Sequence, residues 1–297
     1  MRHHARRAAV GVFSLFVLGA ASACAGGDSA EGGAGDVPSG DRASWTLPVQ
    51  AYLPDEKQKQ LVFDAREALL VKCMARYGFS YKPAPPLPKF GPKSMTDLRY
   101  GIHDEATVSR YGYKPPVDLA AIREQERAAV DGTVLSADEE AVMTGQGAAG
   151  SVAADLPAGG CGGEVVREIT GSDAGQSMLA TELGNEAYIK AQQEPEVKQA
   201  FADWASCMKE KGFPYEKPMD AVDDQRFASE KPSEAELSTA GADLACRAKS
   251  RVAEVWYAAE VTIQKSLIEQ NSERLDKVKS DLALSVKNAS KVLGDKG

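Results

Sequence analysis

Residues 73–81 read CMARYGFSY, and residues 207–215 read CMKEKGFPY. Cys, Met, Gly, Phe and Tyr recur in the same order and at the same spacing. An apolar stripe at helical spacing comes before each phrase, and in the first copy it includes Val62, Ala65 and Leu69. The glycine stands where the left-handed residue that ends a helix belongs. We therefore predict that each phrase ends a helix, and that the chain holds two divergent copies of one helix-turn unit.

The positions of the cysteines indicate one disulfide in each of the two helix-turn units. Each phrase supplies one cysteine, Cys73 or Cys207, and each copy later reaches a second one, Cys161 or Cys246. An even number of cysteines in an exported chain predicts disulfides. The natural pairing is Cys73–Cys161 and Cys207–Cys246, although four cysteines allow two other connectivities as well.

The first 23 residues have the features of an export signal. Three arginines precede an apolar run that is too short to span a membrane. Residues 21–23 (Ala-Ser-Ala) then lead to Cys24, a pattern that resembles the bacterial lipobox, in which the cysteine is diacylated and becomes the first residue. Plain secretion is the alternative, because the same three residues fit an A-x-A cleavage site. The pair Arg6-Arg7 leaves both general secretion and twin-arginine export open.

The remainder of the chain divides by composition. Residues 24–44 are rich in Gly, Ser and Asp and are predicted to form a flexible tether. Residues 45–170 hold the first Cys-helix unit with its insertion, and residues 171–297 hold the second unit. We expect 45–297 to pack as one body. It has no second apolar segment of membrane length, so lipid on Cys24 would be the only membrane anchor.

The two units differ in the segment after the phrase. The first carries a long excursion, residues 90–160, with a helical pattern over 117–130 and a Gly/Ala-rich surface loop over 144–160. After the second, no Pro or Gly interrupts residues 243–293, which predicts one long helix from about Ala240 to Leu293. That helix either bends back near Asn271 or projects as an arm. The predicted fold is therefore mainly α: a disulfide-stapled helical domain with two helix-turn units, a loop-rich insertion and a long C-terminal helix.

The charge balance excludes one class of partner. The chain carries 35 Lys and Arg against 43 Asp and Glu, a formal net charge of −8. Three of the arginines leave with the export signal, which makes the mature chain more acidic still. Such a surface repels phosphates, so we expect no nucleic-acid partner. The sequence leaves the oligomeric state open.

Residues able to do chemistry are sparse. His103 is the only histidine after the export signal, and its neighbours Asp104 and Glu105 do not face it on a helix. We expect it to be an ordinary surface or turn-stabilising residue. The carboxylate doublets Asp223-Asp224 and Glu139-Glu140 lie in polar stretches, where no raised pKa is expected. C-x-x-C spacing is absent, which argues against a zinc site. We predict no catalytic residue, no metal ligand and no cofactor.

Aromatic and arginine residues cluster in the excursion, where the triplet RYG occurs at 99–101 and 110–112. Tyrosine and arginine are frequent in recognition surfaces. The alternative is that the rings fill a small core beneath the excursion. The binding residues predicted on this basis are Arg99, Tyr100, Arg110, Tyr111 and Tyr113.

The lipobox-like start, the repeated CM…GF.Y phrase, RYGI…RYGY and GGC together resemble a widespread group of uncharacterised secreted lipoproteins of actinomycetes, Streptomyces among them. The resemblance covers most of residues 60–260, and its motifs are structural. Members are often encoded near peptidoglycan-binding proteins and ABC-type exporters, which implies an accessory role in the envelope or in transport.

The sequence thus predicts a non-enzymatic lipoprotein, lipid-anchored on the extracellular face of the cell membrane. It would act as a binding or scaffolding component, for a transporter or for cell-wall assembly, with an envelope protein or the cell wall as its partner. The alternative is a hydrolase of cell-wall glycan or peptide.

Overall fold

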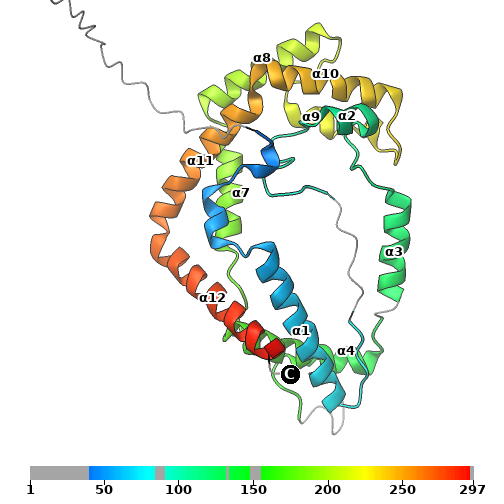
Figure 1. Ribbon diagram of the computed structural model, residues 1–297, viewed down its shortest axis with the longest axis vertical. Coiled ribbons are helices and arrows are strands. Elements are labelled where there is room, and N and C mark those ends of the chain that lie inside the picture. Colours follow the sequence, from blue (N-terminus) through cyan, green and yellow to red (C-terminus); the bar gives the residue numbers. More distant parts are fainter. Residues whose placement is uncertain (1–39, 84–90, 132–133, 148–154, 295–297) are drawn as a thin grey trace, which may run out of the picture. The chain divides into compact units, whose positions relative to one another are not determined.

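The body of the protein consists of α-helices and short 3₁₀-helices joined by turns (Figure 1). The computed structural model describes residues 40–83, 91–131, 134–147 and 155–294, all within the unit Ala34–Gly297. No strand occurs in these ranges, so the predicted mainly α fold is confirmed. None of their helices is both long and apolar enough to cross a membrane. Residues 1–23 and Cys24 lie outside the described ranges. In chain order the elements are η1 (Arg42–Ser44), η2 (Pro48–Tyr52), α1 (Glu56–Arg76), α2 (Glu105–Tyr111), α3 (Leu119–Asp131), α4 (Ala137–Thr144), α6 (Gly160–Thr170), α7 (Leu179–Ala191), α8 (Pro195–Glu210), α9 (Pro218–Val222), η3 (Gln225–Phe227), α10 (Glu234–Ser250), α11 (Val252–Gln270) and α12 (Ser272–Gly294).

Helix α1 is capped at its start and ends as predicted. The carboxylate of Asp55 accepts a 2.8 Å hydrogen bond from the backbone N–H of Gln58, which caps the first turn. At the other end Gly78 has a φ of 85°. The backbone N–H of Phe79 then donates to the carbonyl of Met74 over 3.1 Å. A left-handed glycine with this hydrogen bond is the Schellman ending of a helix.

Helix α8 ends in the same way. Gly212 has a φ of 89°, and the backbone N–H of Phe213 donates to the carbonyl of Met208 over 2.9 Å. The side chain of Met208 is fully buried, as is that of Met74 in the first copy. The repeated phrase is therefore a helix ending, with a core methionine, a turn-forming glycine and a phenylalanine whose amide closes the turn.

Two disulfides join each repeated helix to a later one, with the predicted pairing. Cys73 bonds to Cys161, which links α1 to α6 with a Cα–Cα distance of 5.7 Å. Cys207 bonds to Cys246, which links α8 to α10 with a Cα–Cα distance of 5.6 Å. All four cysteines are buried.

The apolar core of the body consists of several clusters of buried side chains. Around the first disulfide, α1, α4, α6 and α12 bury Ala65, Leu69, Leu70, Met74, Val142, Val165, Ile169 and Ala289. A larger cluster lies between η2, α7, α8, α11 and the start of α12, and includes Leu47, Val49, Leu183, Val197, Phe201, Trp256 and Leu275. The last helix thus contributes to both cores.

The prediction of one long C-terminal helix is wrong, because the segment is broken into shorter helices. The chain forms three helices, α10, α11 and α12, which are separated at Arg251 and Asn271. Arg251 has a φ of 52°, and it is the only non-glycine residue with a positive φ in the described ranges. No Gly or Pro marks this turn, so helical periodicity gives no sign of it. The break at Asn271 agrees with the prediction, and α12 packs back against α1 and α6 rather than projecting.

The packed body also starts earlier than predicted. Arg42–Ser44 fall in the predicted tether, but they form η1, and Arg42 is buried. The hydroxyl of Thr96 lies 2.8 Å from the carbonyl oxygens of both Arg42 and Trp45. Amino-acid composition does not predict this contact, because Thr96 binds backbone carbonyl oxygens and not the side chains of the N-terminal segment.

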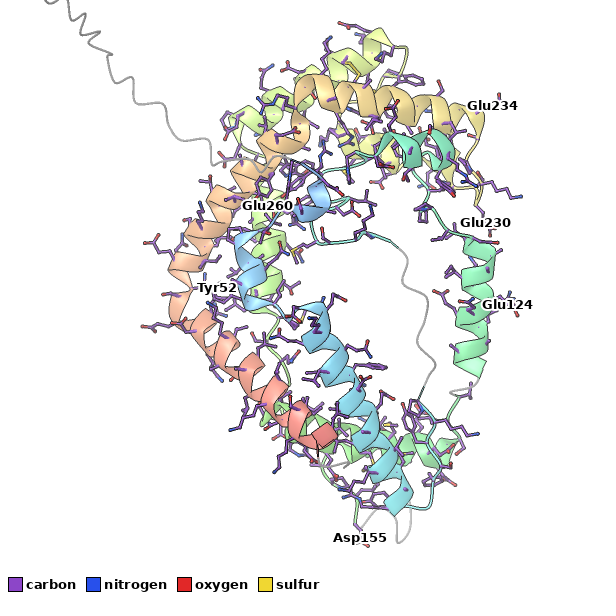
Figure 2. The ribbon with its side chains drawn as sticks, viewed as in Figure 1. Tyr52, Glu124, Asp155, Glu230, Glu234 and Glu260 are labelled. Atoms are coloured by element: carbon purple, nitrogen blue, oxygen red, sulfur yellow. A yellow bond between two sulfur atoms is a disulfide. The ribbon has the colours of Figure 1, made fainter. Side chains whose placement is uncertain are left out.

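The excursion contains three helices. The helical pattern over 117–130 is confirmed as α3, and α2 and α4 lie on either side of it. An ion pair between Arg123 and Glu230 joins α3 to the segment before α10; Figure 2 labels Glu230 at this place. Residues 148–154 of the predicted Gly/Ala-rich loop lie outside the described ranges.

Both disulfides should contribute strongly to stability, because they close loops with sequence separations of 88 and 39 residues. Chain entropy gives upper values of about 4.6 kcal/mol for Cys73–Cys161 and about 3.9 kcal/mol for Cys207–Cys246. Replacing both cysteines of either pair with Ala should lower the free energy of unfolding by several kcal/mol in urea titration. An unchanged urea midpoint for either pair would contradict the pairing.

Candidate functional site

Residues 93–114, which we call the strap, lie between the two N-terminal 3₁₀-helices and helices α10 and α11. The strap contains the RYG triplets at 99–101 and 110–112. Four charged side chains of α10 and α11 receive it, and each of them is 0% exposed: Glu236, Asp243, Arg247 and Glu260. Buried charges are costly unless they are paired and hydrogen-bonded, so the contacts of the strap decide whether these four can stay inside.

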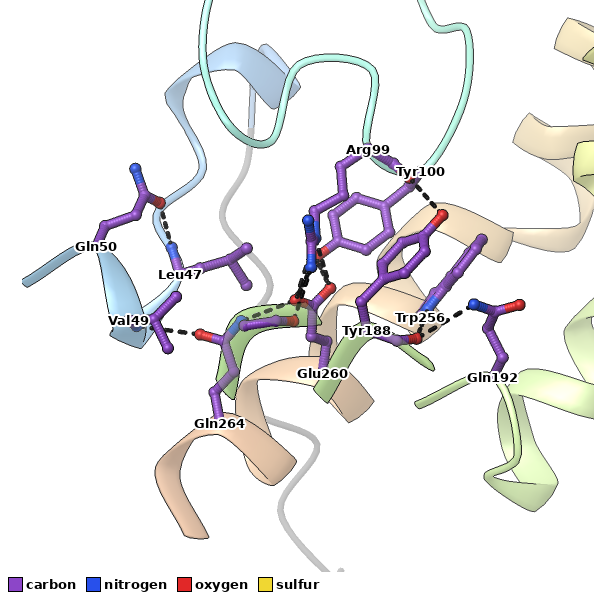
Figure 3. Close-up of polar contacts among 11 residues, drawn as sticks. Leu47, Val49, Gln50, Arg99, Tyr100, Tyr188, Gln192, Trp256, Glu260 and Gln264 are labelled. Atoms are coloured by element: carbon purple, nitrogen blue, oxygen red, sulfur yellow. Dashed lines mark hydrogen bonds and ion pairs between the residues drawn. The ribbon is translucent and has the colours of Figure 1, made fainter. Parts of the chain in front are cut away.

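Glu260 of α11 holds the first RYG triplet (Figure 3). The guanidinium of Arg99 donates to both carboxylate oxygens, with nitrogen–oxygen distances from 2.7 to 3.1 Å. The hydroxyl of Tyr100 donates to Oε2 of Glu260 over 2.7 Å. Burial, and then the neighbouring Glu260, raise the pKa of Tyr100 well above its ordinary value. This tyrosine therefore stays protonated and acts as a hydrogen-bond donor.

The same carboxylate reaches the N-terminal segment through a glutamine. The side-chain amide of Gln264 donates to Oε1 of Glu260 over 2.7 Å. Its carbonyl oxygen accepts from the backbone N–H of Val49 over 3.1 Å. Figure 2 labels Glu260 on α11, the helix that also packs against α7 and η2. One buried carboxylate thus ties the strap, α11 and η2 together.

Arg247 of α10 holds the strap by its backbone. Its Nη1 donates to the carbonyl oxygen of Tyr100 over 2.6 Å, and its Nη2 donates to that of Pro218 over 2.9 Å. Its Nε donates to Oδ1 of Asp243 over 2.7 Å. Gly101 has a φ of 97°, and a Cβ atom there would overlap the guanidinium. Only glycine fits at this point of the strap.

Asp243 and Glu236 hold Tyr113 and Lys114, the two residues that follow the second triplet. Asp243 accepts hydrogen bonds from the indole of Trp204 over 2.7 Å and from the hydroxyl of Tyr113 over 3.1 Å. Glu236 accepts from the backbone N–H of Tyr113 over 3.1 Å, and its other oxygen lies 3.4 Å from the ammonium of Lys114. Burial and the Asp243 carboxylate raise the pKa of Tyr113. The carboxylates of α10 are therefore occupied by the strap.

Aromatic rings enclose Tyr100. Its ring centroid lies 5.7 Å from that of Trp256, 6.0 Å from that of Tyr257 and 6.1 Å from that of Trp45. Edge-to-face and tilted arrangements at these distances are favourable. The side chain of Tyr100 is 0% exposed. Its ring belongs to the core, as the alternative to a binding role anticipated.

The structure separates the five predicted binding residues into two groups. Arg99, Tyr100 and Tyr113 turn inward and bind carboxylates of the body. Arg110 is exposed and Tyr111 is half-buried, and the guanidinium carbon of Arg110 lies 5.1 Å from the ring centroid of Tyr111. Only this last pair presents a surface that a partner could contact.

The histidine and the carboxylate doublets considered for catalysis contact residues close to them in the chain. His103 lies against Asp97, with a distance of 2.7 Å between Nε2 and Oδ1. Hydrogen bonds from Arg226 and Tyr215 lower the pKa of Asp224, and hydrogen bonds from Ser136 lower the pKa of Glu139. A general acid of a glycosidase needs a raised pKa, so each doublet contains one carboxylate with the opposite tendency.

A shallow apolar groove lies beside the N-terminal segment. It has a volume of about 670 Å³ and runs between residues 46–51 and the face of α11 that carries Tyr257 and Val261, with Lys265 at its edge. It is lined mainly by apolar atoms and contains none of the predicted binding residues.

Fold and site together define a helical, disulfide-stapled protein with an internal polar network that fastens a strap. No protein-family model, no curated protein and no solved structure was found to match the chain.

Sequence reasoning missed the four buried charges on α10 and α11. Some signal was present: Asp243 and Arg247 are spaced four apart and lie on either side of Cys246, a cysteine expected to be buried in a disulfide. Glu260 likewise follows Trp256, a large apolar residue, by four positions, so the two lie on the same face of a helix. Charged residues at buried helical positions indicate an internal partner.

The close approach at Gly101 gives a test. Gly101→Ala should lower the free energy of unfolding by about 3 kcal/mol or more, because the new methyl group displaces a buried, paired guanidinium. Gly212→Ala is the matched control, since Gly212 has a similar φ of 89° and a Cβ there meets nothing within 4 Å. It should cost about 1 kcal/mol, from backbone strain alone. Equal losses for the two variants in urea titration would argue against the role of Arg247.

Proposed function

We propose that this chain is a non-enzymatic lipoprotein of the cell envelope, anchored through Cys24 on the extracellular face of the membrane, where it acts as a binding or scaffolding component. The proposed lipid anchor at Cys24 is supported by the cysteine count. The chain has five cysteines, and four of them form two disulfides with one another. Cys24 is the cysteine left over, and it follows an apolar export signal. Disulfides also suit an oxidising compartment.

The non-enzymatic part of the proposal is supported by how the reactive side chains are used. The buried carboxylates, Asp243, Glu236 and Glu260, accept hydrogen bonds from the strap and from neighbouring helices. Catalytic groups are usually found with shifted pKa values in a concave pocket that substrate can enter. Here the buried carboxylates are hydrogen-bonded to groups of the protein itself. This favours a binding or scaffolding role over hydrolysis of cell-wall glycan or peptide.

The partner surface that we propose is the exposed end of α2, with Arg110 and Tyr111. Arginine and tyrosine dominate recognition surfaces, and here the guanidinium of Arg110 lies over the ring of Tyr111. The partner would be an envelope protein or the cell wall, with an accessory role in transport or in cell-wall assembly.

Anchoring can be tested at Cys24. Cys24→Ala should move the protein from the membrane fraction to the culture medium, because no lipid can then be attached. Globomycin, which blocks lipoprotein signal processing, should cause the unprocessed parent chain to accumulate. If the Cys24→Ala chain stays in the membrane fraction, the anchoring proposal is wrong.

The partner surface can be tested by crosslinking in intact cells followed by affinity purification. The double substitution Arg110→Ala, Tyr111→Ala should remove the principal crosslinked partner, whereas Arg274→Ala, which changes an exposed arginine of α12, should leave it. Both variants should unfold at the parent temperature. An unchanged set of partners in the double variant would rule out this surface.

A further inference from the structure

Three side chains capable of binding a metal ion meet where the N-terminal segment joins the strap. They are Asp41, Asp97 and His103, and one ligand atom from each lies within 4.8 Å of those of the other two. Nε2 of His103 is 2.7 Å from Oδ1 of Asp97. Nδ1 of His103 is 3.8 Å from Oδ1 of Asp41. Two carboxylates thus flank one imidazole, one at each ring nitrogen.

The cluster lacks the cation that normally accompanies a buried carboxylate. The side chain of Asp97 is only 9% exposed. Within the described part of the chain, neither Asp97 nor Asp41 forms an ion pair with a lysine or an arginine, and His103 is the ion-pair partner of both. A buried carboxylate without a lysine or arginine partner favours the binding of a positive ion.

The backbone that carries these ligands is fixed on both sides. Thr96, which is 0% exposed, contacts the carbonyl oxygen of Arg42 through its hydroxyl over 2.8 Å. The backbone N–H of Lys93 donates to Oδ2 of Asp97 over 2.6 Å, which leaves Oδ1 directed at the histidine. The ligands therefore stand on a junction that is already ordered, as a metal site requires.

We propose that Asp41, Asp97 and His103 bind a divalent transition-metal ion, with zinc as the best match. One imidazole and two carboxylates are ligands that zinc accepts, and the ligand atoms around a tetrahedral zinc ion stand about 3.3 Å apart for bonds of about 2.0 Å. The ion binds one nitrogen of His103, and with one ligand atom from each residue the three lie within 4.8 Å of one another, so side-chain rotations complete the site. Water supplies the remaining position, because the side chain of Asp41 is 55% exposed.

The ion would fasten the first residues of the body to the strap. Asp41 caps η1, where its carboxylate accepts from the backbone N–H of Ala43, whereas Asp97 and His103 belong to the strap. A metal bridge between them adds a cross-link at the solvent edge of a junction whose interior is held by hydrogen bonds. This site goes beyond the sequence prediction, which expected no metal ligands.

The test uses the full chain carrying His3→Ala and His4→Ala, so that His103 is its only histidine. After treatment with a chelator, the protein is titrated with zinc chloride in a calorimeter. We expect one zinc ion per chain. Asp41→Asn, Asp97→Asn and His103→Ala should each weaken binding at least about tenfold. The matched control Glu105→Gln, which removes an exposed charge two residues after His103, should leave the affinity unchanged.

Thermal unfolding of the same proteins gives a second readout. Zinc should raise the unfolding temperature of the parent chain and of Glu105→Gln, but not that of Asp41→Asn. Asp41 lies at the surface, so its variant should match the parent when metal is absent, and it decides the matter even if Asp97→Asn fails to fold. The proposal is overturned if the parent takes up no zinc, or if Asp41→Asn and Glu105→Gln bind it equally well.

Discussion

The structure depends on the burial of one guanidinium, that of Arg247. It is 0% exposed, and it joins three segments: Asp243 of its own helix, the carbonyl of Tyr100 in the strap, and the carbonyl of Pro218 at the start of α9. A buried cation that lacks such partners costs several kcal/mol. The helices around Arg247 can therefore pack only when the strap is in place.

Interactions of this kind specify a structure more than they stabilise it. Replacing a buried ion pair with apolar residues of similar volume is often neutral or stabilising, whereas removing one partner alone is strongly destabilising. The pair between Arg99 and Glu260 follows the same logic, since Arg99 also donates to the backbone carbonyl of Gly184 in α7. The apolar cores supply the drive to fold, and the buried charges select one position for the strap among the many that apolar contacts alone would allow.

Local features of the fold could be predicted from the sequence, and features that depend on distant contacts could not. The endings of α1 and α8 follow from a few adjacent residues. The repeat favours the observed disulfide pairing, although it leaves two other connectivities open. The turn at Arg251 carries no local signal, because an arginine adopts a left-handed conformation only when the surrounding packing demands it. In the site, the sequence marks the RYG triplets as unusual, but whether Tyr100 faces inward depends on Glu260, which lies 160 residues further along the chain.

The closing of each repeated phrase by a disulfide has a consequence for the order of folding. Cys161, the partner of Cys73, precedes Cys207 in the chain, so a chain that emerges from its N-terminus presents the correct partner before the competing copy appears. This order of emergence favours the native pairing over an exchange of cross-links between the two phrases, which share five of their nine residues.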